Sequence, residues 1–272
     1  MNHTSDKTLP NHDSIPLYQV DAFTDRLFAG NPAAVCLLTS WLPDSTLQQI
    51  AAENNLSETA FLVPQGDDYH IRWFTPLVEV KLCGHATLAS GFVILNYLQP
   101  ERQVITFHSL SGKLIVRRQD DKLQMQFPCL TPDPVSYSFI SEILGVEPEA
   151  VYKAENYLAI LNSEQQIRNL ILNIDAFRCL EGASGLIVSA PGDKVDFVSR
   201  YFTKRLRTLE DPVTGSAHCT LTPYWAERLH KTALHAKQLS ERGGELWCEL
   251  RDNSVYISGK AVLYLQGKIA VK

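Results

Sequence analysis

Short runs of alternating apolar and polar residues dominate this 272-residue chain, a spacing typical of β-strands that bury one face. In the first half, these runs predict strands at 17–23, 33–38, 59–63, 69–74, 104–107, 113–117 and 123–127. In the second half, they predict strands near 157–161, 185–190, 196–202, 233–239, 245–250, 254–257 and 261–269. Because helical spacing is also present, at 44–53 and 139–144, an α+β fold is expected.

Two further segments predict helices of a different kind. The segment 84–98 carries apolar residues on every side of a helical wheel, so that helix must be buried on all sides. In a chain of short strands, a sheet curled around the helix would bury it. A second buried helix is predicted from about Gly215 to Leu229.

An internal repeat precedes both buried helices. Residues 72–75 read Arg-Trp-Phe-Thr and residues 200–203 read Arg-Tyr-Phe-Thr, and each copy leads through a loop to a helix start, at Gly84 and at Gly215. A helix N-terminus presents unpaired N–H groups and a partial positive charge, which suit a carboxylate or phosphate. The repeat therefore predicts two similar domains whose helix starts face one anion-binding site.

A Pro-rich segment, 128–134, is the predicted boundary between these domains. The division gives domains 1–131 and 132–272, each long enough to bury its own core. The last predicted strand, 261–269, could cross from the second domain to the first.

Composition narrows the possible functions. A net charge of −5 without a Lys/Arg run argues against a nucleic-acid surface, and no apolar run could span a membrane. The six cysteines, at 36, 83, 129, 179, 219 and 248, form neither a zinc knuckle nor a disulfide framework; they are typical of free thiols in a reducing cytoplasm. The polar segment 1–15 is expected to be a tail, neither a signal peptide nor an anchor. No glycine-rich nucleotide motif is present.

Glu58 is the first candidate for chemistry, because it stands at the start of an apolar strand. Partial desolvation would raise the pKa of its carboxyl toward the range useful for proton transfer at neutral pH. The alternative is an exposed carboxylate at a strand end, and the residues alone leave both open.

The two helix starts carry the other candidates. His85 could donate to an anion or relay a proton, and Cys83 could have a lowered thiol pKa there, but each could equally be structural. Asp211 could be a helix cap rather than a site residue. Ser216 has no neighbouring base to make it a nucleophile, so it is expected to donate a hydrogen bond.

Taken together, these residues resemble the PhzF-like family, which shares the diaminopimelate epimerase fold. Four blocks carry the resemblance, in the order expected: Val20–Thr24 with Phe28–Val35, Ser57–Phe61, Arg72–Pro76 with Cys83–Thr87, and Glu210–His218. The resemblance implies two pseudo-symmetric, mostly antiparallel barrels, each around a central helix, with the active site between them. It also implies that Glu58 is the acid/base and that His85, Asp211 and Ser216 line the site.

The same resemblance implies a small carboxylate substrate, no metal, no organic cofactor and a homodimer. Asn31, Gly84, Thr214 and Gly215 are then expected to bind the substrate. Diaminopimelate epimerases carry a catalytic cysteine at each helix start, whereas here Cys83 is matched by Pro212 when the two halves are aligned. That difference favours a proton shuttle by one carboxylate.

The predicted activity is thus a cofactor-independent isomerase that moves a proton between carbons of a small acid. One alternative is a non-catalytic module that binds small acids or proteins on the same scaffold. Another is an amino-acid epimerase or racemase that uses Cys83.

Overall fold

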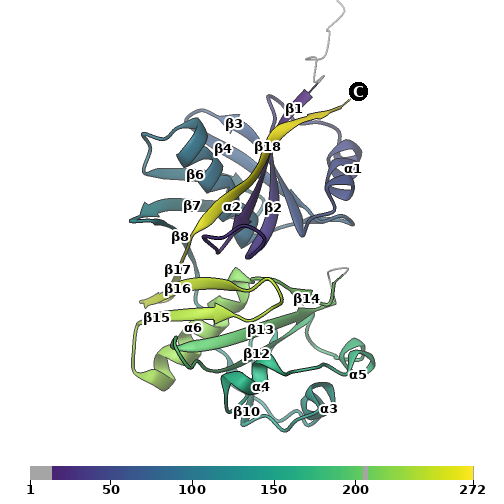
Figure 1. The fold of residues 1–272 in the computed structure, drawn as a ribbon, viewed down its shortest axis with the longest axis vertical. Coiled ribbons are helices and arrows are strands. Elements are labelled where there is room, and N and C mark those ends of the chain that lie inside the picture. Colours follow the sequence, from purple (N-terminus) through teal and green to yellow (C-terminus); the bar gives the residue numbers. More distant parts are fainter. Residues whose placement is uncertain (1–13, 205–207, 272) are drawn as a thin grey trace, which may run out of the picture.

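The computed structural model describes residues 14–204 and 208–271, which form two lobes joined by a continuous sheet (Figure 1). The tail predicted at 1–15 lies outside these ranges, except that Ser14 and Ile15 begin the first strand. In the part of the chain that is described, no helix is long and apolar enough to cross a membrane.

Eight strands form the N-terminal half sheet. In the order of their pairing they are β18 (Ala261–Ala270), β1 (Ser14–Ala22), β2 (Asn31–Leu37), β3 (Glu58–Gln65), β4 (Asp68–Phe74), β6 (Val104–Ser109), β7 (Gly112–Gln119) and β8 (Lys122–Pro128). The two-residue strand β5 (Glu79–Val80) pairs beside the end of β4.

Beyond β8, the sheet continues into the C-terminal half, where the corresponding strands follow in the reverse order. It runs through β17 (Ser254–Gly259), β16 (Gly244–Arg251), β15 (Ala233–Gln238), β13 (Phe197–Thr203), β12 (Gly185–Pro191), β11 (Tyr157–Ile160), β10 (Ala150–Lys153) and β9 (Asp133–Pro134), with β14 (Glu210–Asp211) beside β13. The pairs β2–β3 and β4–β6 are parallel, and so are their counterparts β11–β12 and β13–β15. The repeat seen in the sequence is therefore a repeat of strand pairing.

The helices are α1 (Asp44–Asn54), α2 (Gly84–Val93) with a π-helical turn η1 (Ile94–Leu98), α3 (Phe139–Leu144), α4 (Glu164–Arg168), α5 (Ile174–Arg178) and α6 (Gly215–Leu229). The predicted helices are confirmed, as are most of the predicted strands. The short elements β10, α4 and α5 were not predicted, because four or five residues carry too little periodicity to stand out.

Helix α2 is buried as its composition predicted. It contacts strands β1, β2, β3, β7, β8 and β18, and α6 contacts β15, β16 and β17 in the same way. The α+β class is confirmed, but the pairings of the described strands do not close either half into a barrel. The reason is that β8 pairs with β17 of the other half sheet, which joins the two sheets instead of closing one.

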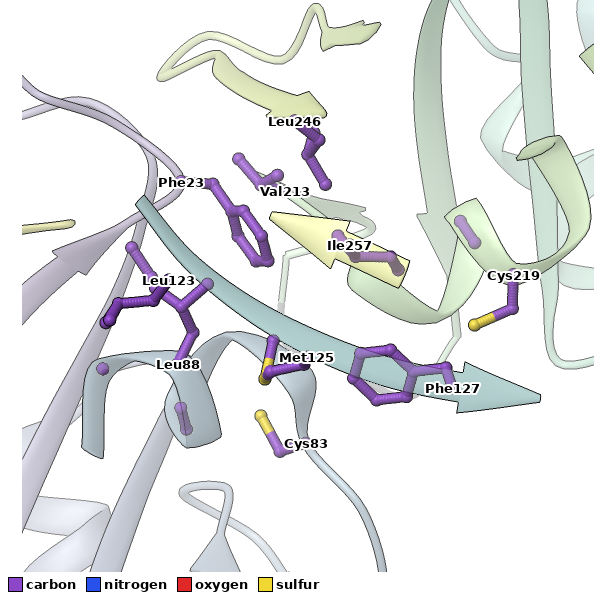
Figure 2. Packing of buried hydrophobic residues seen from close by; sticks show 14 of the residues in the cluster. Phe23, Cys83, Leu88, Leu123, Met125, Phe127, Val213, Cys219, Leu246 and Ile257 are labelled. Carbon is purple, nitrogen blue, oxygen red and sulfur yellow. The ribbon is translucent and has the colours of Figure 1, made fainter. Parts of the chain in front are cut away.

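Three features hold the halves together. Strand β18 returns from the C-terminal half and pairs with β1 along its whole length (Figure 1). Strand β8 carries Leu123, Met125 and Phe127 between the start of α2 and strand β17 (Figure 2). One hydrophobic cluster thus includes buried residues of both halves, so the junction between them is a packed interior.

The repeated Arg-aromatic-Phe-Thr motif has a shared structural role. In β4, Nε and Nη2 of Arg72 donate to Oε1 and Oε2 of Glu79 at 2.7 Å each. In β13, the same atoms of Arg200 donate to Glu210 at 2.7 and 2.8 Å. Such bidentate pairs fix geometry as well as adding energy. Each pair holds a returning short strand just before a buried helix.

Close packing of α2 against β7 gives a first prediction. A Cβ on Gly91 would lie 2.6 Å from Cγ1 of Val116, whose side chain is fully buried and stiff at χ1. Gly91→Ala should therefore lower the free energy of unfolding in urea by about 1–3 kcal/mol, despite the better helix propensity of alanine. Val116→Ala is the matched partner: the double variant should lose less than the sum of the single variants. A Gly91→Ala protein as stable as wild type would show that the contact is not close.

Candidate active site

The two helix starts meet at the junction of the halves. A Cβ on Gly84 would lie 3.9 Å from Cα of Gly215, so the first turns of α2 and α6 face each other at short range. The first N–H groups of a helix have no partner within it. Two sets of backbone donors therefore converge on one place.

The residues that cap these helices correct one expectation. Cys83 caps α2 and Thr214 caps α6, both with extended backbone. Thr214, not Pro212, therefore occupies the position that matches Cys83. The sequence alignment failed because the loop before α6 is the longer of the two and Pro212 lies further from the helix. The second half still has no thiol at its helix start.

Glu58 opens β3 and points to this junction. Its Oε2 lies 3.2 Å from Nε2 of His85, and the Glu58 side chain is only 12% exposed. Burial, followed by the nearby Asp211 carboxylate, raises the pKa of Glu58 to about 8, although a hydrogen bond with Cys83 opposes the rise. Burial also lowers the pKa of His85 to about 3, so the imidazole is neutral at pH 7. The pair therefore combines a carboxyl whose pKa is close to 7 with an uncharged imidazole ring.

Asn31, the first residue of β2, bridges the halves. Its Nδ2 donates to Oδ1 of Asp211 at 2.8 Å and to the carbonyl of Val213 at 2.9 Å, and it lies 3.2 Å from Nδ1 of His85. Because Nδ2 can only donate, the His85 contact requires Nδ1 to accept. The ring proton is then on Nε2 and faces Glu58.

Asp211 is held from both sides. Thr214 Oγ1 donates to its Oδ2 and Asn31 to its Oδ1, and these bonds oppose the effect of burial, which raises the pKa of Asp211 to about 6. Gln238 completes the arrangement: it accepts from the Thr214 N–H and donates to the Asp211 carbonyl. Asp211 is thus an orienting acceptor with both oxygens engaged.

Comparison with known proteins shows the family of the chain. Residues 20–267 match the family described as "Phenazine biosynthesis-like protein". The chain belongs to this family.

Two relatives show how similar the chain is to other proteins of this family. An "uncharacterized isomerase" of Pseudomonas aeruginosa is 48% identical over 256 residues, which cover 94% of this chain and 98% of the relative. The crystal structure of a PhzF-family phenazine biosynthesis protein of Enterococcus faecalis superimposes with a TM-score of 0.92 at 44% identity, over 95% of this chain and all of the other. A hydroxyproline epimerase of Agrobacterium vitis shares the fold alone, at a TM-score of 0.62 and 11% identity over 95% of this chain and 93% of the other.

In this family member, the structure brings together most of the residues predicted from the sequence. Glu58, Cys83, His85, Asn31, Asp211 and Thr214 form one hydrogen-bonded cluster, next to Gly84 and Gly215. Ser216 differs, because it is exposed and makes no hydrogen bond to the cluster among the described residues. Gln238 was missed: a glutamine at the end of a strand gives no sequence signal, since its partners are distant in the chain.

Cys83 is the least reactive member of the cluster. Its Sγ lies 3.5 Å from Nδ1 of His85, but burial and the Glu58 carboxylate raise the pKa of the thiol well above its ordinary value. A helix start lowers a thiol pKa only where solvent or a cation supports the thiolate. The thiol therefore stays protonated at neutral pH.

One set of side chains has the donor types of a metal site. A carboxylate oxygen of Glu58, the thiol of Cys83 and a ring nitrogen of His85 lie within 4.8 Å of one another. Ligation through Nε2 would move the ring proton to Nδ1, against the Asn31 donor at 3.2 Å. The hydrogen bonding of the cluster thus suits a shared proton better than a metal ion.

The raised pKa of Glu58 predicts a pH-dependent stability. A carboxyl whose pKa is higher in the folded state stabilises the fold fully below its unfolded value of 4.5, and this contribution is lost as the pH rises toward 8. The difference in unfolding free energy between wild type and Glu58→Gln should shift in favour of the variant from pH 5 to pH 8.5. The expected slope is on the order of 1 kcal/mol per pH unit, measured by urea unfolding. Parallel curves across this range would mean that the carboxyl titrates normally.

Proposed function

We propose that the protein is a cofactor-independent isomerase that moves a proton between two carbons of a small carboxylic acid. The observation that carries the proposal is the Glu58–His85 contact of 3.2 Å at the buried meeting point of two helix starts. A carboxyl with a pKa near neutrality can both remove and return a proton. The names of relatives such as the Pseudomonas isomerase support the reaction class.

In the proposed reaction, ionised Glu58 removes a proton from one carbon of the substrate. The electron pair left behind delocalises into the adjacent π-system and the carboxylate, and protonated Glu58 then returns the proton to another carbon on the same face. The substrate is rearranged without net loss of atoms or charge. His85 donates from Nε2 to the Glu58 carboxylate and so keeps it pointed at the substrate.

The developing negative charge needs preorganised donors. The backbone N–H groups at Gly84–His85 and Gly215–Ser216 can receive the substrate carboxylate from the two sides. Asn31 is a further substrate contact, because its Oδ1 is buried and has no hydrogen-bonding partner in the described structure. Asp211 and Thr214 hold Asn31 and the start of α6 in place.

Three expectations about organisation belong to the same proposal. We infer a division into domains at 131/132, which is supported by separate hydrophobic clusters within the two halves. A homodimer and a cytoplasmic location are further proposals from the family resemblance. Closure of the halves would exclude water and strengthen the interactions around Glu58.

The alternatives fit the site less well. A binding module gains nothing from a buried carboxyl whose charged form is destabilised next to an anion. An epimerase that uses Cys83 needs a thiolate, and the thiol pKa is shifted in the opposite direction. The one-carboxylate shuttle uses the pKa shifts that are present.

Glu58→Gln tests the proposal directly. Glutamine keeps the shape and a hydrogen bond to His85 but removes the base, so turnover should fall by about 10²–10⁴-fold or more. The assay is mass-shift detection of deuterium uptake by cyclic and amino carboxylic acids in deuterated buffer, first with wild type to find a substrate. Binding of that substrate should survive the substitution.

Cys83→Ala is the matched control in the same cluster. It should keep most of the wild-type turnover, because the thiol stays protonated. An inactive Cys83→Ala protein with a nearly normal Glu58→Gln protein would reverse the roles and support the thiol-based epimerase. Binding without exchange in the wild type would support the binding module.

A further inference from the structure

A cavity of about 320 Å³ adjoins the cluster, and no site residue predicted from the sequence lines it. Its walls include Pro32, Ser57 and Pro212, which are the chain neighbours of Asn31, Glu58 and Asp211. The cavity therefore lies against the backbone segments that carry the reacting groups. Its volume is at the lower end of the range for small-molecule sites.

The walls of this cavity are mainly apolar. Leu56, Pro76 and Leu77 from the N-terminal half face the proline at the start of the α6 loop. Among the described residues that line it, Arg242 alone is ionisable, and the other polar residues are neutral. The described wall therefore suits a ligand with an apolar body and an anionic group that faces Arg242.

Arg242 lies between β15 and β16 in the turn that packs on the loop before β2. Its Nε donates to the Gly30 carbonyl at 2.8 Å, and its Nη2 donates to Oδ1 of Asp21 at 2.8 Å and to the Ala29 carbonyl at 2.9 Å. These bonds fix the plane of the guanidinium. Nη1 makes no hydrogen bond to any described residue, although Arg242 lines the cavity.

The distance from Arg242 to the reacting groups is set by the chain. Arg242 binds Gly30, and the next residue is Asn31, which contacts His85 and Asp211. The guanidinium and the cluster are thus linked through a single peptide unit, Gly30–Asn31.

We propose that the cavity holds the apolar body of the substrate and that Nη1 of Arg242 binds a second carboxylate at its far end. The substrate class is then a small dicarboxylic acid with an apolar, ring-sized body between its acidic groups. This inference rests on the proposed function for the placement of the first carboxylate. It adds Arg242 as the residue that selects the substrate.

The test compares three probes that differ at one position: benzoate, 3-hydroxybenzoate and isophthalate. Binding to wild type is measured by titration calorimetry at pH 7. Isophthalate should bind about 10–100-fold more tightly than benzoate, as expected for a hydrogen bond between charged groups. In Arg242→Met this ratio should fall to near one, with the affinity for benzoate kept within about threefold.

Asp21→Asn is the matched control, because Arg242 also joins the two halves. That substitution weakens the contact between Asp21 and Arg242 but leaves Nη1 in place, so it should lower stability and preserve the isophthalate/benzoate ratio. Arg242→Lys, which keeps the charge, should retain part of the ratio, and it replaces Arg242→Met in the test if the methionine variant does not fold.

A ratio near one in wild type, or equal losses for both ligands in Arg242→Met, would overturn the proposal. If 3-hydroxybenzoate binds as tightly as isophthalate, the far-end group is a neutral acceptor and the dicarboxylate class is wrong.

Failure of this inference can be told from failure of the proposed function. In Glu58→Gln, the ratio of affinities should persist although proton transfer is lost. Normal exchange in Glu58→Gln, with the ratio intact, would reject the proton shuttle and leave the Arg242 site standing. If isophthalate and benzoate bind wild type equally well while exchange depends on Glu58, the Arg242 site is rejected and the proton shuttle stands.

Discussion

The buried amide of Asn31 is the interaction on which the rest of the site depends. Its Nδ2 contacts His85 in one half and Asp211 in the other. Its two N–H bonds are shared among three acceptors, which fixes the direction of the amide. The amide then fixes the ring proton of His85 and one oxygen of Asp211. A buried polar group with such constraints costs free energy unless its partners stay in place, so it specifies one closed arrangement of the halves.

Desolvation then gives this arrangement its chemical character. In water, Glu58 would be fully ionised at neutral pH and a weak base. At the junction, burial and the neighbouring Asp211 raise its pKa, while the same burial keeps His85 neutral and Cys83 protonated. One physical cause thus sorts the three ionisable groups into different roles. The helix starts supply the compensating positive potential without a charged side chain.

The internal repeat explains how two unrelated stretches of chain form one site. The bidentate pairs Arg72–Glu79 and Arg200–Glu210 hold corresponding short strands, and each leads to a helix start. The repeat is exact in strand pairing but not in chemistry: Cys83 corresponds to Thr214, and Glu58 has no counterpart in the hydrogen-bonded cluster. The fold shared with a hydroxyproline epimerase therefore accommodates an asymmetric pair of helix starts.

The sequence by itself determined the buried helices, most strands and the pairing of the two halves, because apolar periodicity and the Arg-aromatic-Phe-Thr repeat are local signals. It also placed Glu58, His85 and Asp211 in candidate blocks. The tertiary structure decided that β8 pairs with β17 instead of closing a barrel, that Thr214 caps α6, and that Gln238 and Arg242 adjoin the site. Apart from the local cap at Thr214, these features are contacts between residues far apart in the chain, so no pattern along the sequence encodes them. The pKa values of Glu58 and His85 belong to the same group, since burial is a property of the packed molecule and not of the residue.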